Sequence, residues 1–165
     1  TTKAQDHNSV RSNKSSSVVA DDADNGGGEN KKSNTGPVKW MAPESLKRTV
    51  NTSRSNIKNI IATLDDLEDQ LNADASTEQK LVNTSRSNIK NQRLTANELQ
   101  ETLSNMEYMD KETALHEVSR KMTAMNSRFQ ILQQSITALG GKYSGISNVL
   151  KSRHDIAMNS IRNMK

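Results

Sequence analysis

The sequence has no cysteine and almost no aromatic residues, since Trp40, Phe129, Tyr108 and Tyr143 are the only aromatics among 165 residues. Without cysteine the chain can form no disulfide framework, thiolate nucleophile or cysteine metal site. Because hydrophobic residues make up only 32% of the chain, a broad globular core is not expected. Burial must come from leucine, isoleucine, valine and methionine arranged in narrow stripes, which is typical of an all-helical protein.

Long apolar runs are also missing. No stretch approaches the roughly 18 apolar residues that cross a bilayer, and the first residues lack the charged and then apolar pattern of a cleavable signal peptide. We therefore expect no stable membrane span, and either a soluble chain or one exported without such a signal. The net charge of +4 comes from interspersed basic and acidic residues, which is typical of solvated helix faces and predicts no nucleic-acid binding.

No pattern of catalytic or metal-binding residues is present. The three histidines, His7, His116 and His154, are scattered, and none lies at metal-ligand spacing from another. A phosphate-binding glycine loop and a nucleophile elbow are both missing. The acidic residues of segment 65–69 have no histidine or second acidic cluster nearby, so we interpret them as a solvated helix flank. We predict that the protein is not an enzyme and binds no cofactor or metal.

Residues 1–36 differ in composition from the rest of the chain. They are rich in Ser, Asn, Lys, Asp and Gly, and Val10, Val18 and Val19 are their only sizeable apolar residues. Such a segment cannot bury enough apolar surface to fold alone. The sequence predicts a disordered N-terminal tail at 1–36 and one coiled-coil helical domain at 37–165.

Three helices are predicted in this domain, at about 43–72, 77–107 and 111–164. Pro43 suits the first turn of the first helix, and Asp110 can cap the third. In the first helix the apolar residues are spaced alternately four and three positions apart, which is the heptad spacing of a coiled coil. Ser53 is the one polar residue at these positions. The predicted pairing seam of this helix consists of Leu46, Val50, Ile57, Ile60, Leu64, Leu67 and Leu71.

The third predicted helix carries the strongest seam, in which no position is polar. Its length is roughly 50 Å, which is more apolar edge than one helix can leave in water, so it must pair with another helix. The predicted fold class is therefore all-α, a long helical hairpin or coiled coil with a disordered N-terminal tail. The seam residues are Leu115, Val118, Met122, Met125, Phe129, Leu132, Ile136, Leu139, Tyr143, Ile146 and Leu150.

Gly140 and Gly141 lie within this seam. Each glycine costs a helix interior about 1 kcal/mol relative to alanine, so the helix is expected to bend there. Two interpretations remain open, a functional hinge and a close approach of a neighbouring backbone. After Leu150 we expect the register to slip, with Ala157, Ile161 and Met164 continuing an apolar edge.

Two local similarities carry no predicted chemistry. A ten-residue string occurs unchanged at 50–59 and 82–91, but its flanks do not match, so it is not a stacking repeat. Residues 36–46, Gly-Pro-Val-Lys-Trp-Met-Ala-Pro-Glu-Ser-Leu, resemble the end of the activation segment of tyrosine kinases. The glycine-rich loop, the catalytic-loop aspartate and the Asp-Phe-Gly motif of a kinase are missing, so no phosphotransfer is predicted.

A further resemblance covers residues 125–150. The residues that carry it are Ser127-Arg-Phe129, Leu139-Gly-Gly-Lys-Tyr-Ser-Gly-Ile-Ser147 and Leu150. This segment is similar to the C-terminal helix of the type III secretion needle-tip and tip-filament family, which includes V antigens, invasin-type tip proteins and EspA- and SseB-like proteins. The resemblance implies that the C-terminal helix pairs with an earlier helix of the same chain, here 115–150 with 46–71, and that such pairs assemble helically.

Two functions follow from these observations. The first is a secreted or bacterial surface subunit of a needle tip or tip filament, which self-assembles and supports protein translocation into host cells. Its partners would be further copies of itself, with a secretion chaperone, a needle subunit or a translocator as additional candidates. The alternative is an intracellular, cytoplasmic coiled-coil adaptor or SNARE-like tether that binds partner helices. A SNARE usually has a glutamine or arginine layer midway along its seam, and neither predicted seam contains one.

Overall fold

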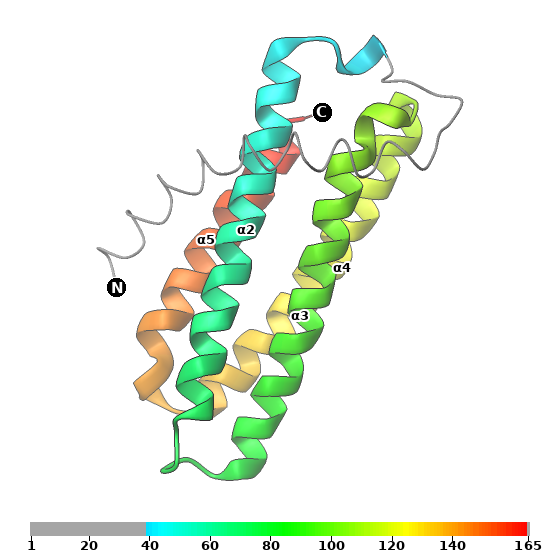
Figure 1. The fold of residues 1–165 in the computed structure, drawn as a ribbon. Helices are drawn as coiled ribbons and strands as arrows, with labels where there is room; N and C mark the ends of the chain where they lie inside the picture. The colour runs from blue at the N-terminus through cyan, green and yellow to red at the C-terminus, as the bar shows by residue number, and fades with distance from the viewer. Residues whose placement is uncertain (1–38, 165) are drawn as a thin grey trace.

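The computed structural model describes residues 39–164, which form a bundle of antiparallel helices (Figure 1). Its long helices are α2 (Glu44–Asn72), α3 (Gln79–Asn105), α4 (Lys111–Ala138) and α5 (Ser144–Arg162). Within residues 39–164 there are also three short 3-10 helices, η2 (Lys39–Met41), η3 (Met106–Tyr108) and η4 (Gly141–Tyr143). The prediction of an all-α fold is confirmed, whereas the predicted tail at 1–36 lies outside the described residues.

The predicted continuous helix at 111–164 is corrected by the structure. Helix α4 ends at Ala138, the chain reverses, and α5 begins at Ser144 and runs back along the bundle (Figure 1). Gly140 has a φ of 103°, a backbone conformation that residues with a side chain rarely adopt. The two glycines therefore form a turn between two helices, where the sequence had predicted a bend within one. The long hairpin becomes a four-helix bundle.

Neighbouring helices in the chain are not equally close partners in space. The most extensive packing joins α3 to α4, and α2 to α5 and α3, whereas α4 and α5 touch only lightly. The expected pairing of 46–71 with 115–150 is thus corrected, because α2 pairs with α5 and α4 pairs with α3. The reversal at Gly140 causes this difference, since it returns the second part of the predicted seam to α2.

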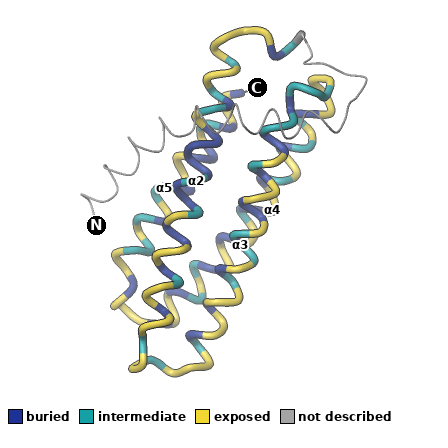
Figure 2. Tube along the Cα trace, in the orientation of Figure 1, coloured by how far each residue is buried: buried dark blue, intermediate teal, exposed yellow. Residues whose placement is uncertain are grey.

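The buried residues lie on the facing sides of the helices (Figure 2). Most of them are aliphatic residues or methionine. Leu46, Leu115 and Ile146 are partly buried, and every other predicted seam residue is buried. Each of these side chains stabilises the fold by on the order of 1.5 kcal/mol or more through removal of apolar surface from water. The seams are therefore covered by the chain's own helices.

The kinase-like segment closes one end of the bundle. Within its described part, Trp40 Nε1 donates a hydrogen bond to the backbone oxygen of Met109 at 2.8 Å. Met41 is buried in the core, and the backbone oxygen of Pro43 accepts two amide hydrogen bonds from the first turn of α2. These contacts fasten η2 to the connection between α3 and α4 and give the segment a structural role.

The ten-residue string adopts the same orientation in its two copies. Both copies are helical, and both bury their first, fourth and eighth residues, which share one helix face. The buried residues are Val50, Ser53 and Ile57 in α2, and Val82, Ser85 and Ile89 in α3. The string therefore supplies a core-facing stripe twice.

Candidate helix-pairing interface

The interface between α2 and α5 contains a buried polar contact within its apolar seam. Ser53, the one polar position in the predicted seam of α2, places its Oγ 2.9 Å from the Oγ of Ser160 on α5. Asn56 Nδ2 donates a second hydrogen bond to Ser160 Oγ at 3.2 Å. Ser53 is 0% exposed, so this contact compensates its hydroxyl for the loss of water. We call Ser53, Asn56 and Ser160 the serine layer.

A second polar contact crosses the same interface. Arg153 of α5 donates from one guanidinium nitrogen to the backbone oxygen of Asn59 at 3.3 Å and to Thr63 Oγ1 at 3.0 Å. Arg153 is only 5% exposed. Burial lowers the pKa of Arg153, and the nearby charge of Asp66 opposes this shift. Since Arg153 and Ser160 are one heptad apart, both contacts lie on the same face of α5 and fix its register on α2.

The apolar edge expected after Leu150 is confirmed, because Ala157, Ile161 and Met164 are buried. The expected loss of register is corrected by the polar contacts of α5. Positions 153, 157, 160 and 164 continue the alternating spacing of three and four residues. Arg153, Ala157 and Met164 are buried at these positions, and Ser160 bonds to Ser53. The register continues with polar residues at two positions. Sequence reasoning missed it because it tested only for apolar residues.

His154 holds α5 to α4. Its imidazole stacks on the ring of Phe129, with centroids 4.0 Å apart and planes 4° from parallel. Its Nε2 lies 2.7 Å from Asn126 Oδ1, which accepts the hydrogen bond because an amide oxygen cannot donate. Burial lowers the pKa of His154 to about 4. The imidazole is therefore neutral at pH 7. Its position in the sequence, with no other histidine nearby, gave no indication of this role.

The loop between α2 and α3 meets the turn between α4 and α5 at Asp74. Its carboxylate accepts hydrogen bonds from Tyr143 Oη at 2.5 Å and from Thr77 Oγ1 at 2.7 Å, and it forms an ion pair with Lys142 at 3.3 Å. It also accepts from the backbone amides of Ser76 and Thr77. We call Asp74, Lys142 and Tyr143 the Asp74 cluster. It joins two connections that are 65 or more residues apart in the sequence.

The hydrogen bonds of the Asp74 cluster change the acidity of its members. The bond from Tyr143, followed by the bond from Thr77, holds the pKa of Asp74 far below its usual range. Burial and the bond to Asp74 raise the pKa of Tyr143 to about 12. Asp74 is therefore ionised and Tyr143 is protonated at neutral pH, which are the two states that this hydrogen bond requires.

Replacing Asp74 with alanine is expected to loosen both connections. Amide hydrogen exchange at Ser76 and Thr77 should become faster, because both amides lose their acceptor. The apparent pKa of Tyr143 should fall from about 12 toward its ordinary value. Exchange measured by NMR and an ultraviolet titration in a Tyr108→Phe background would test both effects. Asp69→Ala, at an exposed position on α2, is the matched control; equal exchange in the two variants would contradict this role of Asp74.

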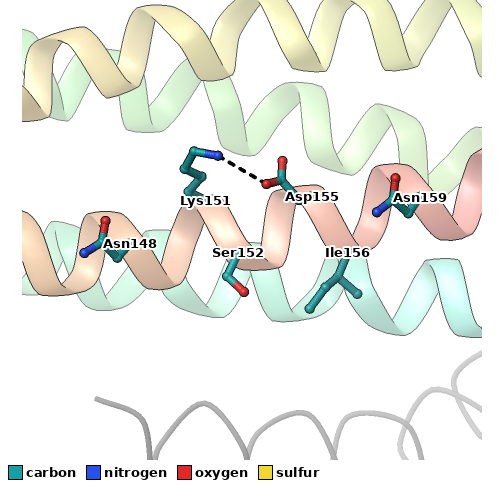
Figure 3. A pocket seen from close by; sticks show the side chains of 6 residues that line it. All are labelled: Asn148, Lys151, Ser152, Asp155, Ile156 and Asn159. Carbon is teal, nitrogen blue, oxygen red and sulfur yellow. Dashed lines mark hydrogen bonds and ion pairs between the residues drawn. The ribbon is translucent and has the colours of Figure 1, made fainter.

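The outer face of α5 carries a surface depression lined by one helix alone (Figure 3). Lys151 and Asp155 form an ion pair at 3.3 Å across one turn of this helix, and the side chain of Ile156 points away from that pair (Figure 3). Ile156 is exposed, as are Leu94 and Ile131. Among residues 39–164 these are the large apolar side chains that face outward.

Other types of site were sought in the part of the chain that the structure describes. Residues 39–164 contain no group of three histidine, aspartate or glutamate side chains placed to hold a metal ion. None of the helices described is both long and apolar enough to cross a bilayer. The features found define a four-helix bundle with a register-setting interface between α2 and α5. No protein-family model, curated protein or solved structure matches this chain.

Proposed function

We propose that this chain is a structural subunit that acts by helix pairing, as a secreted component of a type III secretion needle tip or tip filament. It assembles with copies of itself and supports the translocation of proteins into host cells. The interface between α2 and α5 is the observation that carries the proposal. There the C-terminal helix of the chain pairs with an early helix through polar contacts that set its register. The resemblance of residues 125–150 to that family implies that a C-terminal helix pairs with an earlier helix, a role that α5 has here in place of the whole segment 115–150.

Assembly must use surfaces other than the closed seams. Within one chain the seam residues are buried or partly buried against the chain's own helices. Contact with further copies therefore uses outward residues such as Leu94, Ile131 and Ile156, or it requires a helix to leave the bundle. Both routes keep the proposed subunit monomeric at low concentration and assembled at high concentration.

The polar interior favours a second candidate, a cytoplasmic adaptor or SNARE-like tether. Gln92 of α3 is 0% exposed, and neither atom of its amide has a hydrogen-bond partner. An unsatisfied buried amide costs about 1–3 kcal/mol. A foreign helix that offered a polar group to Gln92 would recover this energy. Although the predicted seams contain no glutamine or arginine, Gln92 and Arg153 lie in the bundle interior, as polar layers do in helical tethers.

Light scattering and electron microscopy across a range of concentrations would separate the two candidates. We expect the wild-type chain to form rings or filaments as its concentration rises. A chain that stays small at every concentration and binds only an added foreign helix would contradict the secreted subunit and favour the adaptor. Leu94→Asp, Ile131→Asp and Ile156→Asp are suitable surface variants, because each adds a charge outside the core. Loss of assembly in one of them, with the helix content retained, would locate the contact.

A further inference from the structure

The seam of α4 continues into α5 without a change of phase. Ile136, Leu139, Tyr143, Ile146 and Leu150 keep the alternating spacing of three and four residues, although the chain reverses between Leu139 and Tyr143. A turn between two separate helices does not require this spacing, because the apolar positions of each helix can have their own phase. A continuous helix from 111 to 162 would place all five residues on one face.

Two features hold the turn against a continuous helix, the backbone conformation of Gly140 and the Asp74 cluster. Gly140 adopts its φ of 103° because it lacks a side chain, and a Cβ on Gly140 or Gly141 would find no atom within 4 Å. A methyl group at either position would therefore meet open space. The hydrogen bonds from Tyr143 and Lys142 to Asp74 tie the turn to the rest of the bundle. Two glycines and the Asp74 cluster thus set the balance between the turn and a helix.

The contacts of α5 can be made equally well by a second copy of the chain. Its serine layer and the hydrogen bonds of Arg153 to Asn59 and Thr63 reach α2. Its contacts with α4 include His154 on Phe129 and Asn126, and Ser147 Oγ on Gln133 Oε1 at 2.9 Å. All of these lie outside the turn. If α5 of one copy took the place of α5 in another, every one of them would form again between chains.

From these observations we propose that α5 exchanges between two copies of the chain, with the Gly140–Gly141 turn opening into a continuous helix from 111 to 162. The occupant of the α2 seam is then α5 of the second copy. Each α5 leaves its own bundle at the end that carries the Gly140–Gly141 turn. It enters the second bundle at the corresponding end of that bundle. The product is a closed, twofold-symmetric dimer. This inference rests on the proposed function and deepens its self-assembly part by naming the helix that is exchanged.

A disulfide between chains can detect this exchange directly. The chain has no cysteine, and the Oγ atoms of Ser53 and Ser160 are 2.9 Å apart. A Ser53→Cys chain and a Ser160→Cys chain, distinguished by mass, are unfolded together in urea, refolded together and oxidised. A disulfide that joins the two introduced thiols forms only if α5 of one copy lies on α2 of the other. A single chain with both substitutions is the positive control, because it closes the bond within the bundle.

Substitutions in the turn should shift the balance. In Gly140→Ala the turn is strained by the positive φ, whereas a continuous helix gains propensity, so we expect the exchanged dimer to increase at least about tenfold. Gly141→Ala is the matched control, because it adds the same methyl group and its φ is not in the left-handed region. It should raise the dimer less than Gly140→Ala does. An equal rise in the two variants would contradict the role of Gly140.

The outcomes separate this inference from the proposed function. An interchain disulfide between the Ser53→Cys and Ser160→Cys chains, increased when both also carry Gly140→Ala, supports exchange. If that bond fails to form while the chain with both cysteine substitutions closes normally, exchange is excluded, even where wild-type filaments persist. If the bond forms but no larger assembly appears, exchange stands and the tip or filament function fails. Should Gly140→Ala not fold, the mixed refolding of the two chains with the native turn decides the question.

Discussion

Leu132→Asp is expected to unfold the bundle at neutral pH, whereas Ile131→Asp should leave it folded. The two side chains are adjacent in α4, but Leu132 is 0% exposed and Ile131 is 48% exposed. Loss of a buried leucine side chain alone costs about 2–5 kcal/mol, and an ionised carboxylate without a partner adds several more. This sum is comparable to the whole stability of a small domain, which is about 5–15 kcal/mol.

Circular dichroism and urea denaturation at pH 7 would measure this difference. The comparison of Leu132→Asp with Ile131→Asp controls for the added charge, because both variants place one aspartate in the same turn of α4. Leu132→Ala, with an expected loss of about 3 kcal/mol, keeps the effect measurable if the aspartate variant is fully unfolded. Lys142→Ala should be mild, because its side chain is 44% exposed and an ion pair at such a site contributes little. A folded Leu132→Asp chain with wild-type stability would contradict the assignment of this seam to the core.

The bundle is expected to lose about 3 kcal/mol of stability as the pH falls from 6.5 to 4, owing to His154 alone. The pKa of His154 is lowered by burial from 6.5 to about 4 in the folded chain. The unfolded chain therefore binds more protons between these two values, so stability rises with pH across this interval. The loss begins as the pH falls below 6.5 and is complete below about 4. Each pKa unit corresponds to about 1.4 kcal/mol.

Urea denaturation at several pH values, with His154→Gln as the test variant, would isolate this effect from the carboxylates. Glutamine can still donate a hydrogen bond to Asn126, but it does not titrate. Between pH 6.5 and 4 the free energy of unfolding of the wild type should fall by about 3 kcal/mol more than that of His154→Gln. His116→Gln is the matched control, since it removes an exposed histidine of α4. Parallel curves for the wild type and His154→Gln would show that His154 is not buried as described.

The two largest effects concern different parts of the architecture. Leu132 belongs to the apolar seam that builds the core, and its effect is on folding itself. His154 belongs to the contact between α5 and α4, which is the lighter of the contacts that α5 makes. Protonation of His154 would therefore weaken the attachment of α5 before it weakens the pairing of α3 with α4. Acid conditions are expected to favour release of α5, the same helix that the proposed exchange moves.

The helical fold and the apolar faces as far as Leu150 were predictable from the sequence alone. The spacing of three and four residues at Ile57, Ile60, Leu64 and Leu67 identifies one helix face as apolar, and those side chains are fully buried. This signal is local, because the helical repeat relates residues on a single element. The low aromatic content and the seams together were sufficient to predict an all-α fold, but they do not state which helix covers which face.

Only the tertiary structure decided the reversal at Gly140 and the pairing of α2 with α5. The seam keeps one phase from Ile136 to Leu150, so the same pattern fits both a continuous helix and two antiparallel helices. In the sequence Ser53 only interrupts an apolar seam and Asp74 is an ordinary loop residue. In the structure Ser53 contacts Ser160, and Asp74 accepts a hydrogen bond from Tyr143. These contacts join residues 69 to 107 positions apart. Periodicity along one helix reports that a face is buried, whereas the identity of its partner depends on contacts between distant segments.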